Sequence, residues 1–284
     1  MRFVSLKWNK LDEWTPVIFL ADNGKNAKSG LVSMPLWDSH LEIIIGEKFC
    51  SGYSRGAYHY TCDSKAGASD RKCSSCEKAD EWLPCIKCRG SCINLKKRAA
   101  CETAPYIVYM AAFGEKVKVG VSNYFRFYER ILEQGADFSV RLLEVKDGGH
   151  ARHLEQKISK ATGITDRVRS AFKLRNFISD PNQSAAALSR NIVKIIESGF
   201  PVGENTPIYD MRRFYRIFNA KQPFKEADYS NKISGSVACV KGSIAILKNS
   251  EGLLQVNFRE LVGCDVFIKA KREIPEDYSL KMFS

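Results

Sequence analysis

Eight cysteines between Cys50 and Cys101 are the residues whose type and spacing predict chemistry most directly in this chain. They are Cys50, Cys62, Cys73, Cys76, Cys85, Cys88, Cys92 and Cys101. Cys73 and Cys76, and likewise Cys85 and Cys88, have the C-x-x-C spacing that places two thiolates on one metal ion. Because two such pairs and four further thiols share 52 residues, the sequence predicts a metal-binding module.

In chain order the thiols divide into two sets of four, and four thiolates complete a tetrahedral zinc site. The first set is Cys50, Cys62, Cys73 and Cys76, and the second is Cys85, Cys88, Cys92 and Cys101. The spacing also permits crossed pairing between the sets, or an iron–sulfur cluster in the second. We expect two structural zinc ions, since four cysteines leave no coordination position open for water or substrate. His59 is close enough in the chain to replace a thiol, but eight cysteines make it a bystander.

Disulfide bonding is the alternative use of such a cluster, and the cellular compartment decides between the two. The N-terminus has no continuous apolar segment typical of a secretory signal, and no run of about 18 apolar residues could span a membrane. We therefore expect a cytoplasmic protein with reduced thiols and no membrane partner. Cys239 and Cys264 lie in apolar C-terminal runs, where we expect them to be small buried hydrophobic residues.

Three clusters of basic side chains contribute to a net charge of +12 and a pI near 9.2. They are Lys87, Arg89, Lys96, Lys97 and Arg98; Arg167, Arg169, Lys173 and Arg175; and Arg212, Arg213 and Arg216. The third cluster alternates with aromatic residues that could stack on bases. Clusters of this kind favour a polyanion, most often nucleic acid, and leave DNA and RNA open. A solvated basic surface is the alternative.

The predicted fold class is α+β, with four segments that differ in composition. Residues 1–49 form an N-terminal β segment, and residues 50–104 a cysteine-rich zinc module with too few large aliphatic residues to fold without metal. Residues 105–180 form a central α/β domain. Residues 181–284 begin with a helical linker and end in short strands typical of a small β barrel or sandwich.

The central domain has the predicted order β-β-α-β-α. Strands are expected at 106–113, 117–121 and 138–145, and helices at 124–134 and 150–161. Gly135 and Gly163 follow the two helices, as glycines do at helix C-termini.

Five polar residues of this domain form a candidate catalytic set. They are Tyr109, Lys118, Arg126, Arg130 and Glu155. A glutamate could hold Mg²⁺ or Mn²⁺, an arginine could neutralise a phosphate, and a tyrosine could help to deprotonate water for phosphodiester cleavage. Taken singly, the residues have ordinary structural alternatives: a core aromatic side chain, a solvated helix face and an ion pair between Glu155 and Arg152.

Tyr106-Ile-Val-Tyr109, followed by Val117-Lys-Val-Gly-Val-Ser122, resembles the two signature strands of the GIY-YIG nuclease superfamily. The resemblance implies that Tyr109 is the tyrosine of the first signature and Gly120 the glycine of the second. It also implies that Arg126 or Arg130 is the helix arginine and that Glu155 is the metal-binding glutamate.

Two positions depart from the GIY-YIG pattern, because Ile107 replaces a glycine and Lys118 replaces the second tyrosine. A phosphate-binding role is the simplest one for this lysine. The chain as a whole also resembles a prokaryotic family of unknown function that joins a cysteine-rich segment to a GIY-YIG-like unit. The stretches Val117–Val121 and Leu132–Ala136 are its most typical part.

Three functions agree with these observations. The first is a zinc-containing nucleic-acid-binding protein whose GIY-YIG-like domain no longer cleaves. The second is an active endonuclease on DNA or structured RNA that depends on a divalent metal at Glu155. The third is an assembly factor on ribosomes or another ribonucleoprotein, with the zinc module as a docking surface. The missing second tyrosine favours the first.

Overall fold

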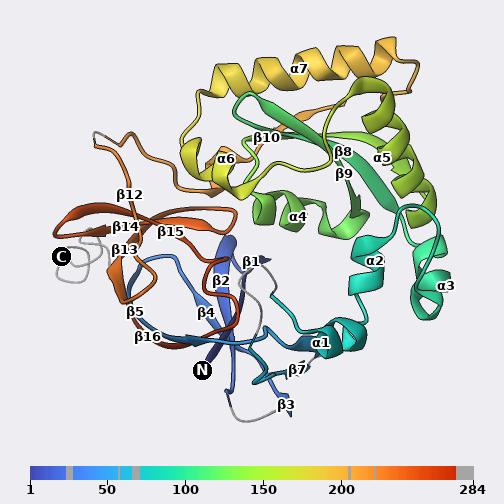
Figure 1. The fold of residues 1–284 in the computed structure, drawn as a ribbon. Helices are drawn as coiled ribbons and strands as arrows, with labels where there is room; N and C mark the ends of the chain where they lie inside the picture. The colour runs from blue at the N-terminus through green and yellow to red at the C-terminus, as the bar shows by residue number, and fades with distance from the viewer. Residues whose placement is uncertain (24–27, 57, 66–70, 204–205, 221, 273–284) are drawn as a thin grey trace. The chain divides into compact units, whose positions relative to one another are not determined.

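The computed structural model describes residues 1–23, 28–56, 58–65, 71–203, 206–220 and 222–272, which form a mixed α+β protein (Figure 1). The chain divides into two compact units. Unit 1 combines Met1–Glu81 with the C-terminal part from Phe218 onward, and unit 2 is Trp82–Ile217. Within the described ranges, no helix has both the length and the apolar character needed to cross a membrane.

Unit 1 is built on a nine-stranded sheet with strands from both ends of the chain. Its strand order is β12-β15-β14-β13-β5-β16-β1-β2-β4. Strand β5 lies between β13 and β16 and is antiparallel to both, so the two chain ends form one sheet. The bounds are β1 (Arg2–Lys10), β2 (Trp14–Ala21), β4 (Val32–Pro35), β5 (Ser39–Lys48), β12 (Lys225–Glu226), β13 (Lys232–Lys241), β14 (Ile244–Asn249), β15 (Gly252–Asn257) and β16 (Cys264–Arg272).

The pairing of the chain ends differs from the predicted division, which separates residues 1–49 from the C-terminal strands. Ile43 of β5 pairs with Ile233 of β13, and both side chains are buried. Across the sheet core, the Phe3 and Phe258 rings stack with centroids 5.9 Å apart. A few short strands bury too little apolar surface to be stable alone, and pairing the two sets gives each a partner.

A smaller three-stranded sheet, β3-β7-β6, completes unit 1 together with α1 (Ser74–Ala79). Its strands are β3 (Lys28–Ser29), β6 (Tyr53–Arg55) and β7 (Tyr58–Tyr60). Tyr53 and Tyr60 face each other across the β6–β7 pair, with stacked rings 4.9 Å apart. Because β6 and β7 are antiparallel neighbours, the residues just before β6 and just after β7 are brought to the same end of the pair.

Unit 2 contains a four-stranded antiparallel sheet of order β11-β10-β8-β9. The element order β8-β9-α4-β10-α5 confirms the predicted β-β-α-β-α order. Gly135 and Gly163 follow α4 and α5 with φ of 71° and 70°, as expected for C-terminal caps. The strands are β8 (Tyr106–Phe113), β9 (Lys116–Asn123), β10 (Phe138–Val145) and β11 (Ile208–Asp210). The helices are α2 (Leu83–Lys87), α3 (Leu95–Thr103), α4 (Phe127–Gln134), α5 (Gly148–Thr162), α6 (Ser170–Arg175) and α7 (Pro181–Glu197), with short 3₁₀ helices η1 (Tyr124–Arg126) and η2 (Arg212–Phe214).

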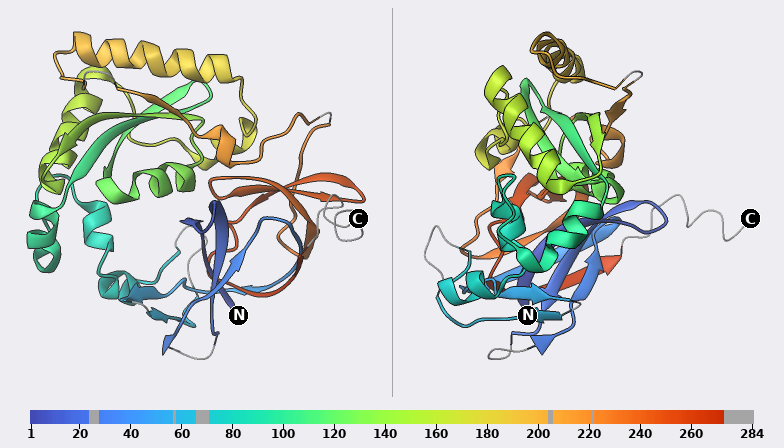
Figure 2. Two further views of the ribbon diagram at one scale, coloured as in Figure 1. Left: turned by 180° about the vertical axis from the view of Figure 1, so that it is seen from behind. Right: turned by 90° about the vertical axis from the view of Figure 1, so that its right-hand side faces the viewer.

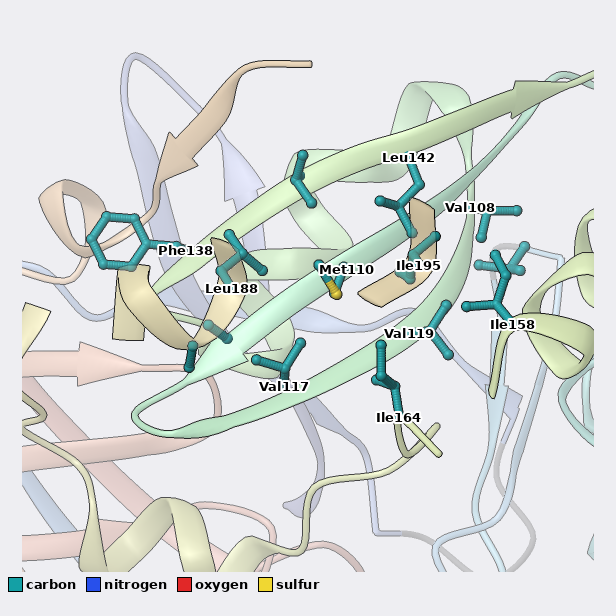
Figure 3. Close-up of a cluster of buried hydrophobic side chains, with 14 of the residues drawn as sticks. Val108, Met110, Val117, Val119, Phe138, Leu142, Ile158, Ile164, Leu188 and Ile195 are labelled. Carbon is teal, nitrogen blue, oxygen red and sulfur yellow. The ribbon is translucent and has the colours of Figure 1, made fainter. Parts of the chain in front are cut away.

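Different helices cover the two faces of the unit 2 sheet. Val108 and Met110 of β8 pack in a buried apolar cluster with Ile158 of α5 and with residues of α7 (Figure 3). Tyr109 lies between them in the strand and therefore points to the opposite face. On that face its ring contacts Phe127 of α4, with centroids 6.1 Å apart. Figures 1 and 2 show α7 and α4 on opposite sides of this sheet.

Candidate metal centre and predicted catalytic residues

The first set of predicted zinc ligands converges in unit 1. Cys50 follows β5, Cys62 follows β7, Cys73 is the N-cap residue of α1, and Cys76 lies in the first turn of that helix. The hairpin and the helix thus bring together four thiols from 27 residues of chain. All four sulfur atoms lie within 4.8 Å of one another, and three of these side chains are buried.

The distances within this group fit a tetrahedral metal ion. Sulfur atoms about 2.3 Å from a zinc ion are about 3.8 Å apart along each edge of the tetrahedron. The Cys62 and Cys73 sulfur atoms are 3.8 Å apart, far longer than a disulfide bond of about 2.05 Å. All ten cysteines of the chain are free thiols. The donor set therefore fits a metal such as zinc, held by Cys50, Cys62, Cys73 and Cys76.

Backbone N–H groups donate hydrogen bonds to sulfur atoms of this centre, which favours the thiolate form of these cysteines. The Cys73 N–H donates a hydrogen bond of 3.2 Å to the Cys50 sulfur. The Cys76 N–H donates in the same way to Cys73 and is the main cause that lowers the Cys73 pKa to about 7. Burial acts in the opposite direction and raises the pKa of Cys50 and of Cys76. Buried thiols in this arrangement would ionise when a cation binds, because metal coordination and thiol deprotonation are coupled.

His59 lies on β7 beside the centre and is only 2% exposed. Its Nδ1 is 3.0 Å from the Ser54 hydroxyl, and burial lowers its pKa to about 4. His59 is not one of the four grouped ligands, which agrees with its expected role as a bystander.

The second set of thiols lies in unit 2 and is arranged differently. Within the part of the chain that the structure describes, these four do not form a group of three or more with sulfur atoms within 4.8 Å. The Asn94 side-chain amide donates 3.2 Å to the Cys85 sulfur, and the Cys92 thiol donates 3.4 Å to the Asn94 carbonyl. The Tyr106 hydroxyl donates 3.7 Å to Cys101. The Cys88 thiol donates 3.6 Å to the Ser91 carbonyl. The four thiols thus have separate partner groups, and the zinc site of this set stays a prediction.

Tyr109 and Gly120 of the GIY-YIG-like signatures are direct partners across β8 and β9. A Cβ on Gly120 would lie 2.5 Å from the Tyr109 ring and hydroxyl, so the ring occupies the space above the glycine. The Tyr109 hydroxyl accepts a hydrogen bond of 2.6 Å from Gln134 at the end of α4. This tyrosine is 1% exposed, and these contacts give it a structural role.

Replacing Gly120 by alanine should therefore destabilise unit 2 by about 1–3 kcal/mol, because the added methyl group overlaps the Tyr109 ring. Urea denaturation measures the free energy of unfolding of three variants, which are Gly120→Ala, Tyr109→Leu and the double variant that carries both changes. A leucine side chain in place of the Tyr109 ring should remove much of the cost of the methyl group. An equal cost of Gly120→Ala in both backgrounds would show that the Tyr109 ring is not the cause.

Lys118 and the two arginines of the candidate catalytic set lie near this face. The Lys118 ammonium group is 5.8 Å from the centre of the Tyr109 ring. Arg126 is ion-paired with Glu129, and its guanidinium Nε donates 2.9 Å to that carboxylate. Arg126 and Arg130 each lie 3.9 Å from Glu133. Both arginines are thus partly neutralised by neighbouring acids of α4.

Glu155 lies apart from this group. It is 7% exposed and shares a helix face with Ala151 and Ile158, both in the cluster between the sheet and α5 and α7. That cluster is on the sheet face opposite Tyr109. Arg152 donates a hydrogen bond of 3.0 Å to the Glu155 carboxylate. The structure thus brings Tyr109 and Lys118 together with α4, and puts Glu155 on the helix that covers the other face.

Two arginines outside the predicted set have unusual surroundings. Arg141 on β10 pairs with Tyr109 across the strands. Its guanidinium carbon lies 4.7–5.8 Å from the centres of four rings, which are Tyr124, Phe127, Tyr128 and Tyr209. Arg2 is buried beside the first cysteine set. A single arginine within a strand belongs to no recognisable sequence motif. Its alternation with an adjacent apolar residue, which places it on one face of the sheet, was the only signal in the sequence.

The predicted nucleic-acid-binding residues all lie in unit 2, and several of them form ion pairs or hydrogen bonds within the protein. Arg89 is 3.3 Å from Asp166, Arg98 pairs with Glu102, and Arg212 pairs with Asp210. The Lys173 ammonium donates 2.8 Å to the Gln134 carbonyl. The exposed members are Lys87, Arg89, Lys96, Arg98, Arg167, Arg169, Arg175, Arg213 and Arg216.

Comparison with known proteins adds one finding. Residues 41–266 match the sequence model of a family described as "Protein of unknown function (DUF2797)". The matched stretch begins in β5, ends in β16 and includes all eight clustered cysteines and the β8–α7 region. No curated protein and no solved structure matches the chain.

Proposed function

Because the chain belongs to the DUF2797 family, whose description names no activity, we propose its function from its own residues. The proposal is a zinc-containing protein that binds single-stranded nucleic acid through unit 2 and does not cleave it. The zinc ion at Cys50, Cys62, Cys73 and Cys76 is structural, since four thiolates leave it no free coordination position.

The observation that carries the proposal is the unequal distribution of charge between the units. Unit 2 contains 23 Lys and Arg and 13 Asp and Glu residues, which gives +10 of the chain's net +12. Unit 1 contains 21 basic and 19 acidic residues and is nearly neutral. A basic surface general to the protein would be shared by both units. A charge confined to one unit favours a polyanionic ligand there.

Exposed apolar side chains among these charges favour unpaired bases over a duplex. Trp82, Ile93 and Leu95 are 54%, 59% and 76% exposed, in a segment that also holds the basic residues from Lys87 to Arg98. The Lys97 ammonium lies 4.2 Å from the centre of a Trp82 ring. An aromatic ring beside a cation is the arrangement on which bases of single strands stack. Duplex DNA keeps its bases stacked internally and would leave such rings unused.

A GIY-YIG-like assignment of residues 105–180 is supported by the β8-β9-α4-β10-α5 order and by the Tyr109–Gly120 pair. Loss of cleavage is supported by Lys118 at the position of the second signature tyrosine. It is also supported by Glu155, which is paired with Arg152 on the helix opposite Tyr109. If the glutamate and the tyrosine do not share one location, the metal ion and the water that the tyrosine would activate cannot act on the same phosphate.

A second zinc ion at Cys85, Cys88, Cys92 and Cys101 is part of the proposal. Cys85 and Cys92 both contact Asn94, which places two of the four thiols beside one residue. The segment 83–103 has no buried residue in its two helices, which accords with a module that depends on metal for its stability.

A nuclease assay with the Glu155→Gln variant tests the absence of cleavage. We expect neither the native protein nor the variant to cut labelled single-stranded or structured RNA or DNA with Mg²⁺ or Mn²⁺. Both should bind these strands with affinities within about twofold of each other, because Glu155 is 7% exposed and paired with Arg152, so its replacement leaves the exposed basic side chains unchanged. Cleavage by the native protein that Glu155→Gln abolishes would instead establish a metal-dependent endonuclease.

A further inference from the structure

A buried arginine adjoins the cysteine group of unit 1. Arg2 lies at the start of β1 and is 1% exposed. Its Nη1 donates a hydrogen bond of 2.9 Å to the carbonyl oxygen of Cys62 and lies 3.4 Å from that of Cys50. One guanidinium group therefore contacts the backbone of two candidate metal ligands that are twelve residues apart in the chain.

The remaining contacts of Arg2 also involve neighbours of these cysteines. Its guanidinium carbon lies 4.4 Å from the centre of the Phe49 ring, and Nη2 is 3.5 Å from Asp63. Phe49 precedes Cys50 and Asp63 follows Cys62, so Arg2 touches both cysteine-bearing segments at two residues each. Its planar guanidinium can serve several acceptors at once, which the single ammonium group of a lysine cannot do in the same geometry.

Arg2 also belongs to the junction between β1 and β16. It pairs with Asp265 across the two strands, and its Nε donates 2.7 Å to the Asp265 carboxylate. Two backbone hydrogen bonds between Met1 and Val266, of 3.0 and 2.7 Å, continue this junction. The Arg2 side chain thus connects the β1–β16 junction to the segments that carry the thiols.

Charge gives Arg2 a second effect on the centre. A divalent cation with four thiolates has a net charge of −2, and an anionic group inside a protein is unfavourable unless a cation lies near it. Arginine stays protonated at all relevant pH values. Asp63 and Asp265 share this cation, but their side chains are 35% and 29% exposed and so remain partly solvated.

We propose that Arg2 is the positioning residue of the Cys50–Cys62–Cys73–Cys76 centre, which it holds against the β1–β16 junction, and that its charge slows the release of the metal. The inference rests on the zinc centre of the proposed function. Since linkage is reciprocal, zinc binding and β1–β16 pairing strengthen each other. Residues that orient metal ligands from outside the coordination sphere commonly change metal affinity by about 10–100-fold.

Zinc release to a chromophoric chelator tests this role in the full-length protein with Cys85 and Cys88 replaced by serine, so that all zinc comes from the first centre. Arg2→Met should release zinc about 10–100-fold faster, and Arg2→Lys, which keeps the charge, should be intermediate. Hydrogen exchange of the Val266 amide should accelerate in Arg2→Met and after zinc removal, because both changes loosen the junction.

Arg55→Met is the matched control, since Arg55 is exposed and pairs with Glu81 in the same unit. It should release zinc at the unchanged rate. An Arg2→Met protein that melts earlier but releases zinc no faster would overturn the role of Arg2 and leave the zinc centre intact. If Arg2→Met does not fold, an unchanged release rate in Arg2→Lys overturns that role in the same way. A parent protein that purifies without zinc overturns the zinc centre itself and the role of Arg2 with it.

Discussion

Replacing Cys76 by serine should remove one zinc ion per chain and destabilise unit 1 by more than about 4 kcal/mol. Cys76 is 5% exposed and lies in the cluster that its thiol forms with Cys50, Cys62 and Cys73. A serine hydroxyl is a poor zinc ligand, so the site would be left with three thiolates. Because structural metal binding contributes directly to folding, its loss removes a large part of that stabilisation. Elemental analysis and thermal unfolding of the purified variant measure both effects.

Cys239→Ala is the matched control for this prediction. Cys239 is 1% exposed on β13, and burial raises the pKa of its thiol to about 12, as expected for a small apolar residue of the core. Its replacement should leave the zinc content unchanged and cost only a small cavity. A Cys76→Ser protein with its full zinc content would contradict the assignment of the centre.

The same measurement on Cys88→Ser decides the second site. The loss of a second zinc equivalent would establish zinc at Cys85, Cys88, Cys92 and Cys101. A brown protein that contains iron would assign an iron–sulfur cluster to these thiols instead. Zinc content that depends on the first set alone would leave the second set as free cysteines.

Neutralising Lys96, Lys97 and Arg98 together should have the largest effect on nucleic-acid binding. The change of all three to glutamine should weaken binding to single strands by about tenfold or more at low salt. The slope of log affinity against log salt should fall by about 2, because each phosphate contact on a single strand contributes about 0.7. Fluorescence anisotropy with a labelled oligonucleotide over a salt series measures both quantities.

A triple variant of unit 1 separates local contacts from overall charge. Lys225, Lys232 and Lys269 are exposed lysines of the nine-stranded sheet. Their change to glutamine removes three positive charges, as many as the unit 2 variant loses. This control should keep the native salt slope. Equal loss of affinity in both triple variants would mean that net charge alone, and no defined surface of unit 2, attracts the nucleic acid.

Local features of the sequence predicted the β8-β9-α4-β10-α5 part of unit 2 and the pairing of Cys73 with Cys76 on one metal ion. A continuous apolar run predicted β8, alternating apolar residues predicted β9, and Gly135 and Gly163 marked the ends of α4 and α5. The Cys73–Cys76 spacing predicted a pair of ligands at one turn of chain, where α1 now begins. These predictions succeed because periodicity, glycine caps and C-x-x-C spacing are set by residues near one another in the chain.

The burial of Glu155 is a feature that helical spacing could have indicated. Ala151, Glu155 and Ile158 have this spacing, so an apolar face that points to the sheet includes the glutamate. Tyr109 alternates with Val108 and Met110, so it had to point to the opposite face from them. The side of the sheet that α5 would cover, however, depends on the tertiary path of the chain.

The sequence by itself determined the chemistry of this protein: eight clustered thiols, a basic central region and a β-β-α-β-α order of elements. The sequence also predicted Cys50, Cys62, Cys73 and Cys76 as one set but left crossed pairing open, and the structure groups these four. Only the tertiary structure decided that strands from both chain ends share one sheet and that Arg2 joins that sheet to the cysteine group. The physical reason is that side-chain periodicity specifies which face of an element is buried. The partner that covers this face is selected by packing between residues far apart in the chain.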